Sequence, residues 1–264
     1  MRRGSAVLLF AWLTVCATAR AEAGAWTQAE GATQIIAGAT YSGASTSYGS
    51  SGVADKPVAF SKLWSSIWAE YGWSDDLTLI VSPEFASART GSETSPAMRA
   101  SDFAYGAGVR YRLFDSFGVL SLQAMVKSAG AFDMSVAVDD KSGEQGELRL
   151  LYGTNFSLFD RQGFFDAEIA ERWIAGARPN ETPLDLTLGY HVFHNDLVLI
   201  QSFNIVSGGD ARPPYTYYRS HKLELSWVTD LGHGICIQTG SYISPAGQNA
   251  LDEKGAQVSL WLSF

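Results

Sequence analysis

Four histidines, His191, His194, His221 and His233, are the side chains of this sequence best suited to acid–base or metal chemistry. A hydrolytic site needs a nucleophile, a base and an orienting group within reach of one another. Ser220 directly precedes His221, and neighbouring residues of a strand point to opposite faces. His191 and His194 are three positions apart, which also divides them between two faces and does not suit shared metal binding. We therefore predict no catalytic residue, no metal site and no cofactor.

Paired carboxylates are the next candidates for chemistry. Asp75-Asp76, Asp139-Asp140 and Asp252-Glu253 all fall in expected turns or loops. Acidic residues are frequent there because their side chains bond to nearby backbone groups. We interpret the three pairs as solvated turn residues and expect that the protein is not an enzyme. The alternative is a lipid or peptide hydrolase, whose activity would be lost on changing His191 or His221.

Composition restricts the class of protein. The chain has 264 residues, of which 46% are hydrophobic and 12% aromatic. Only 17% are charged, compared with roughly 25% in ordinary soluble domains. This content is too apolar for a disordered protein. The 27 acidic residues against 19 Lys and Arg also exclude a nucleic-acid partner bound by phosphate neutralisation.

The N-terminus has the layout of a secretory signal. Two arginines precede an apolar stretch over residues 6–19, and the small-x-small triplets Ala19-Arg20-Ala21 and Ala21-Glu22-Ala23 follow. The apolar stretch is too short for a spanning helix with stop-transfer flanks. We predict a signal peptide over residues 1–23 and a barrel over residues 24–264, with an uncleaved anchor as the alternative.

After the signal, apolar and polar residues alternate with a period of two, which is typical of strands with one apolar face. In residues 101–114, Phe103 and Val109 lie on one face, and Arg110 and Arg112 lie on the other. About twelve such segments are expected. They cover residues 31–42, 60–72, 77–88, 101–114, 117–129, 146–157, 164–176, 184–194, 196–207, 216–229, 234–244 and 254–264.

The connections between these segments alternate in length. Short turns are expected at residues 73–76, 114–117, 160–163, 194–196 and 230–233. Longer connections rich in Ser, Gly and Pro are expected at residues 43–59, 89–100, 130–145, 177–183, 208–215 and 245–253. Short periplasmic turns, longer external loops and an even strand count are features of transmembrane barrels. The predicted fold class is therefore all-β: a closed, antiparallel, up-and-down transmembrane β-barrel.

Aromatic residues gather beside the short turns, as in the interfacial girdle of such barrels. The residues of this predicted girdle are Tyr71, Trp73, Phe114, Phe117, Phe159, Phe164, Phe165, Phe193, Trp227 and Phe264.

If Phe103 and Leu260 face lipid, the opposite faces of the strands enclose charged residues of both signs. The predicted pore-lining residues are Arg110, Arg112, Lys127, Glu147, Arg149, Asp166, Glu168, Arg172, His191, Lys222 and Glu224. The same faces carry Lys62, Glu70, Gln123, Asp185, Gln238 and Gln257. Charges turned away from lipid need water or partners. Either a polar pore or an interior plugged by ion pairs meets this need, and twelve strands allow both.

The C-terminal segment AQVSLWLSF, an amphipathic strand ending in Phe264, resembles the final strand of bacterial outer-membrane barrel proteins. The segments GAWTQAEGATQIIAGATYS and EYGWSDDLTL resemble the opening strands of porin or transporter barrels, including outer-membrane proteins of phenol-degradation pathways. This resemblance implies the fold and a place in the outer membrane of a Gram-negative bacterium. It also implies that the last strand is the signal for the barrel-assembly machinery.

These patterns lead to one expected function. We expect a porin-like channel or passive transporter for small solutes, surrounded by outer-membrane lipid and lipopolysaccharide. Two alternatives remain open: a plugged structural or adhesive barrel that acts through its outer loops, and the lipid hydrolase named above.

Overall fold

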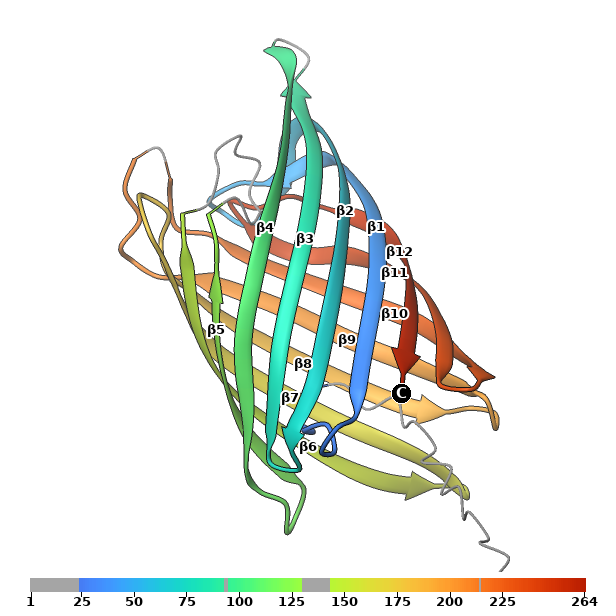
Figure 1. Cartoon of the computed structure of the whole chain (residues 1–264). Coiled ribbons are helices and arrows are strands. Elements are labelled where there is room, and N and C mark those ends of the chain that lie inside the picture. The colour runs from blue at the N-terminus through green and yellow to red at the C-terminus, as the bar shows by residue number, and fades with distance from the viewer. Residues whose placement is uncertain (1–23, 93–94, 130–142, 214) are drawn as a thin grey trace, which may run out of the picture.

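The computed structural model describes residues 24–92, 95–129, 143–213 and 215–264. Twelve strands form one closed barrel, and each strand pairs antiparallel with its neighbours (Figure 1). The strands are β1 (Thr33–Tyr48), β2 (Ala54–Ser74), β3 (Leu77–Ser92), β4 (Ser95–Phe114), β5 (Val119–Lys127), β6 (Gln145–Leu158), β7 (Arg161–Ile174), β8 (Glu181–His191), β9 (Asp196–Ser207), β10 (Arg219–Gly232), β11 (Ile235–Gln248) and β12 (Lys254–Ser263). The predicted all-β barrel is confirmed.

Closure joins the two ends of the described chain. β1 pairs with β12 along its length, from Gln34 opposite Ser263 to Gly43 opposite Lys254. This pairing removes the free sheet edge, whose unpaired backbone groups lipid could not satisfy. No helix in the described residues is long and apolar enough to cross a membrane.

Three of the long connections are shorter than predicted. β1 and β2 extend into residues 43–59, β3 and β4 occupy most of residues 89–100, and β11 continues to Gln248 within residues 245–253. The β3–β4 hairpin projects beyond the rest of the barrel at the long-loop end (Figure 1). These extensions are rich in Ser, Gly and Thr, so the apolar alternation that identifies the spanning strands is absent. The predicted loop over residues 130–145 and the predicted signal peptide lie largely or wholly outside the described residues.

The two faces of each strand separate as predicted. On β4, Phe103 and Val109 are exposed on the outside of the barrel, whereas Ala104 and Arg110 are buried inside. On β12, Val258 is exposed and Ser259 is buried. Large apolar side chains therefore form a belt around the barrel, and such a surface is stable in lipid rather than in water.

The prediction of the aromatic girdle is wrong for one residue, Phe164. Phe164 points into the barrel and is only 4% exposed, whereas most of the predicted girdle, including Trp73, Phe117 and Phe264, is exposed beside the short turns. Phe164 packs inside against Leu199, Val228 and Trp261 in an apolar cluster. Its neighbour on the outer face is Phe165. With two aromatic residues in a row, closeness to a turn does not indicate the face, but the alternation with Asp166 does.

Candidate functional site

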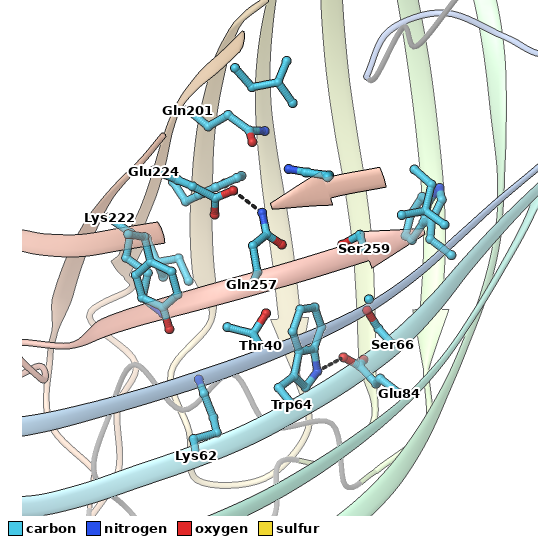
Figure 2. A pocket seen from close by; sticks show the side chains of 18 of the residues that line it. Thr40, Lys62, Trp64, Ser66, Glu84, Gln201, Lys222, Glu224, Gln257 and Ser259 are labelled. Atoms are coloured by element: carbon cyan, nitrogen blue, oxygen red, sulfur yellow. Dashed lines mark hydrogen bonds between the residues drawn. The ribbon is translucent and has the colours of Figure 1, made fainter. Parts of the chain in front are cut away.

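The interior of the barrel contains a cavity of about 520 Å³, which we call the outer cavity (Figure 2). It lies toward the long-loop end. Five aromatic side chains line it: Trp64, Trp68, Phe203, Tyr242 and Trp261. Charged side chains face the same space, among them Lys62, Glu84, Lys127, Lys222 and Glu224.

Polar groups of the outer cavity are joined across strands. The indole nitrogen of Trp64 donates to Glu84 at 3.0 Å, and Lys127 forms an ion pair with the same carboxylate at 2.7 Å. On the other wall, the Gln257 amide and the Ser226 hydroxyl both donate to Glu224. Figure 2 shows the Trp64–Glu84 and Gln257–Glu224 bonds on two walls of the cavity. The cavity therefore combines flat apolar surfaces with fixed polar groups.

The loop between β11 and β12 folds inward instead of into solvent. Glu253 is fully buried and accepts hydrogen bonds from Ser42 at 2.5 Å and Tyr242 at 2.8 Å. The same carboxylate pairs with Lys62 at 3.3 Å and Lys222 at 2.8 Å. The interpretation of this residue as a solvated turn carboxylate is therefore wrong. A hairpin loop at the mouth of a barrel can turn back over the lumen, and the positive charges of Lys62 and Lys222 on the wall attract the carboxylate of Glu253.

The pKa of Glu253 reflects this environment. Burial alone would raise the pKa of its carboxyl, but Lys222 and Lys62 outweigh burial and lower the pKa from 4.5 to about 2. Leu251 in the same loop packs on Phe60, Ala86 and neighbouring residues inside the barrel. We call residues 249–253 the latch, because they tie the β11–β12 loop across β2 and β10 at the outer end.

An inner cavity of about 300 Å³ lies beside the first, toward the short-turn end. The two cavities share the lining residues Ile36, Trp68, Lys127 and Arg172. The remaining residues of the inner cavity are mostly charged or amide side chains on β2 and on β4–β7.

Arginines organise the wall of the inner cavity. Arg149 contacts three carboxylates: Glu147 at 2.8 Å, Glu168 at 2.5 Å and Asp185 at 2.7 Å. Arg172 joins Glu147 at 2.9 Å to Glu181 at 2.7 Å. Strand register brings these groups together, since Glu147 is opposite Arg172 and Glu168 is opposite Asp185. The result is a continuous ion-pair network across β6, β7 and β8.

We call residues 24–32, which precede β1, the N-terminal strap. Residues 24–28 lie inside the barrel at the short-turn end, whereas residues 29–31 are exposed beside the β2–β3 turn. The backbone amide of Ala25 donates to Asp166 of β7 at 2.9 Å, and the Ala25 carbonyl accepts from Ser121 at 2.5 Å. Farther along, Gln28 donates from its backbone to Thr78 at 2.8 Å. The strap thus contacts β3, β5 and β7 and crosses the interior of the barrel.

Trp26 is the apolar anchor of the strap. Its ring meets Phe164 edge-on, with centroids 5.8 Å apart, and its carbonyl accepts from Arg110 at 2.9 Å. A Cβ at Gly153 would lie 2.6 Å from the Trp26 ring, so this position on β6 leaves room for the indole only as glycine. Trp26 also joins the cluster of Ala25, Val119 and Leu151. The buried part of the strap therefore packs against the barrel wall in the way that side chains pack in a hydrophobic core.

The predicted lining residues divide into two groups. Inside the barrel, at the two cavities or against the strap, lie Arg110, Lys127, Glu147, Arg149, Asp166, Glu168, Arg172, Lys222 and Glu224. The other two are at the short-turn end and border neither cavity. Arg112 pairs with Asp76 at 2.6 Å and with Asp115 at 3.6 Å, and His191 is the last residue of β8.

Several residues of the site were not predicted. Trp64 and Trp68 share a strand face with Lys62 and Glu70, so the period of two could have identified them. Neither the strap nor Glu253 has such a signal, because both lie outside strands. Within the described ranges, no group of three or more His, Cys, Asp and Glu side chains is placed to hold a metal ion.

No known protein family and no curated protein matches this sequence. Solved structures are similar in fold. An outer-membrane channel from Pseudomonas putida F1 has a TM-score of 0.69 at 14% identity, with 91% of this chain and 98% of that chain covered. The translocator domain of the autotransporter NalP from Neisseria meningitidis gives 0.57 at 12% identity, covering 90% of each chain.

A third similar structure is the NanC porin, with a TM-score of 0.53 at 9% identity over 86% of this chain and 98% of that chain. All three comparisons are to barrels of the outer membrane, and at these identities they bear on the fold. Together with the apolar belt, the fold is that of a bacterial outer-membrane β-barrel.

Proposed function

We propose that this barrel is a porin-like channel or passive transporter for small solutes, with the outer cavity as the chamber that receives the solute. The observation that carries the proposal is the position of that cavity. The outer cavity lies inside the closed wall of the barrel and shares lining residues with the inner cavity. The two cavities succeed one another from the long-loop end toward the short-turn end.

The size and lining of the outer cavity favour small molecules that are hydrophilic or mildly apolar. Its volume of about 520 Å³ is within the range of small-molecule sites. Indole and phenyl faces can cover a flat or apolar part of a solute, while lysine, carboxylate and amide groups replace the water around its polar part. No bond-making group is required for this task, and we propose that the protein is not an enzyme.

The strap and the Arg149 network set the size limit. They occupy the short-turn half of the lumen, so a solute that has reached the outer cavity must pass the inner cavity or displace the strap. Ion pairs on both sides of the inner cavity would give a transverse field along this path. We therefore expect small conductance rather than that of a wide general porin.

Purified protein in planar lipid bilayers tests the proposal. We expect discrete single-channel openings above the lipid background, together with flux of small uncharged solutes into vesicles that contain the protein. Absence of both conductance and flux would contradict the channel.

A plugged structural or adhesive barrel is the second candidate. The observation in its favour is the strap, which is packed against Phe164 and Leu151 like part of a core. This candidate predicts a silent protein in bilayers and unchanged solute uptake in a deletion strain, with altered binding at the cell surface.

A further inference from the structure

Asp166 is a carboxylate buried inside the barrel, 2% exposed on the lumen face of β7. The backbone amide of Ala25 donates to it at 2.9 Å, and the side chain of Glu168 is within hydrogen-bond reach of it. Among the described residues, no Lys, Arg or His side chain forms an ion pair with it. The nearby arginines are occupied elsewhere, since Arg110 pairs with Glu70 at 2.8 Å and Arg149 pairs with Glu168.

This isolation is unusual for a buried charge. A carboxylate taken out of water is stable when a positive group and hydrogen bonds compensate it. Here the Ala25 amide and the charge of Arg110, which is paired with Glu70, supply only part of that compensation. The neighbouring carboxylate of Glu168, two positions along the same strand face, adds repulsion. The site therefore calls for one more positive charge beside Asp166.

The residue next to this carboxylate is Gly24. A Cβ at Gly24 would collide with the Asp166 carboxylate, so the Cα of Gly24 lies against it, and the next amide along the chain donates to it. Gly24 also borders the inner cavity, where the other lining groups include Glu147 and Glu168. The nitrogen of Gly24 is attached to that same Cα. A charge on this nitrogen would be beside Asp166 and would have space around it.

We propose that the α-ammonium group of Gly24, produced by cleavage between Ala23 and Gly24, is the buried counter-ion of Asp166. The step is hydrolysis by a signal peptidase. Water adds across the amide bond and the C–N bond breaks. The water oxygen stays on the Ala23 carbonyl carbon, giving a carboxylate, and both water protons pass to the Gly24 nitrogen, which keeps its own hydrogen and becomes an ammonium group. Processing then completes the charge balance of the lumen and fixes the start of the strap.

An ion pair between Gly24 and Asp166 also distinguishes the two candidate cleavage sites of the leader. Cleavage after Ala21 would leave Glu22 and Ala23 in front of Gly24. The amino group would then be two residues away, and Glu22 would bring a further carboxylate toward Asp166 and Glu168. Cleavage after Ala23 supplies the missing cation without this addition.

Full-length protein expressed in a Gram-negative host, purified from its outer membrane in detergent, tests the proposal in two steps. Intact mass and N-terminal sequencing are expected to give Gly24 as the first residue. A mature chain that begins at Glu22 or retains the leader overturns the proposal.

The second step measures the reactivity of the α-amino group toward an amine-acylating ester at pH 7. An α-amino group normally has a pKa near 8, and each unit by which a counter-ion raises it lowers the reactive fraction about tenfold. We expect at least this protection in the folded protein relative to the heat-unfolded protein. Equal rates in the folded and unfolded wild type would overturn the proposal without any variant.

The variant Asp166→Asn separates charge from mere burial. Asn keeps an oxygen that can accept from Ala25, so the strap retains its bond while the negative charge is lost. We expect most of the protection to disappear in this variant. Glu224→Gln is the matched control, because it neutralises another buried lumen carboxylate that borders the outer cavity and not the inner cavity beside Gly24, and it should keep the wild-type rate. Unchanged protection in Asp166→Asn would show that the terminus is only shielded and would overturn the ion pair.

Discussion

The carboxylates of the inner lumen outnumber the cations that hold them, and Arg149 is the residue on which most of them depend. It bridges Glu147, Glu168 and Asp185 at 2.5–2.8 Å in a largely buried position. Removing one partner from a buried ionic group leaves the others uncompensated, which is far more costly than losing a surface pair.

Arg149→Gln is therefore expected to lower the free energy of unfolding by about 3–5 kcal/mol. Chemical unfolding in detergent, followed by tryptophan fluorescence, measures this quantity. Lys254→Gln is the matched control, since it removes one positive charge at an exposed position at the start of β12. The control should change stability by less than about 0.5 kcal/mol. Equal losses for the two variants would contradict the network.

Glu253 allows a prediction about pH. Its carboxyl pKa is about 2 in the folded barrel and 4.5 as its ordinary value, because Lys222 and Lys62 overcome the effect of burial. A lowered pKa means that the folded state favours the charged form. The resulting stabilisation, about 3 kcal/mol, is fully present above pH 4.5 and is lost as the pH falls toward 2.

The unfolding free energy of Glu253→Gln should thus be lower than that of the wild type by about 3 kcal/mol at pH 7, with the difference shrinking below pH 4.5. Unfolding curves at pH 7 and at pH 3 measure the change. Asp252→Asn, a change at the adjacent position, keeps an oxygen that can accept from Thr46 and should lower the unfolding free energy at pH 7 by less than Glu253→Gln. A constant difference between wild type and Glu253→Gln at both pH values would contradict the latch.

At the scale of elements, the strap is the part of the structure with the clearest consequence for the proposed transport of solutes. It is held by Trp26 against Phe164 and by backbone bonds to Ser121 and Thr78. A short segment held by one large side chain can detach when that side chain is lost, while the barrel itself stays closed.

Trp26→Ala is expected to free the strap and to raise single-channel conductance several-fold, because the short-turn half of the lumen would open. Bilayer recordings of the purified variant measure the effect. Trp227→Ala removes an indole of similar size from the outside of the barrel, and it should leave conductance unchanged. An unchanged conductance in Trp26→Ala would mean that the strap does not limit the path.

The strands show which parts of this fold can be predicted from the sequence. All twelve strands were predicted, and the lumen faces of β4 and β12 were assigned correctly, since a period of two fixes the face of every residue in a spanning strand. Beyond the apolar belt the same rule fails, and the polar extensions of β1 to β4 resemble loops.

The contacts between side chains of the candidate site are harder to predict from the sequence. Alternation predicts that Arg149 and Glu168 are inside, but which of them meet depends on strand register, and register follows from the whole closed barrel. The strap has no alternation at all, and Glu253 is in a loop. Both are placed by long-range contacts with β7 and β10, which no local pattern reports.

At the scale of the whole molecule, the apolar belt and the charged lumen are two sides of the same strands. The belt suits the hydrocarbon of a bacterial outer membrane, and the lumen holds two adjoining cavities between the latch and the strap. We propose that the path of solute follows these cavities through the interior of the barrel.

A pair of neighbouring cysteine variants tests this path. Ser259 faces the outer cavity and is 7% exposed, whereas Val258 faces outward and is 51% exposed. Both are changed singly to cysteine in a Cys236→Ser background and recorded in bilayers before and after a bulky charged thiol reagent is added. We expect the reagent to reduce the current of Ser259→Cys and to leave the current of Val258→Cys unchanged. Equal responses of the two variants, or no current to reduce, would contradict this path.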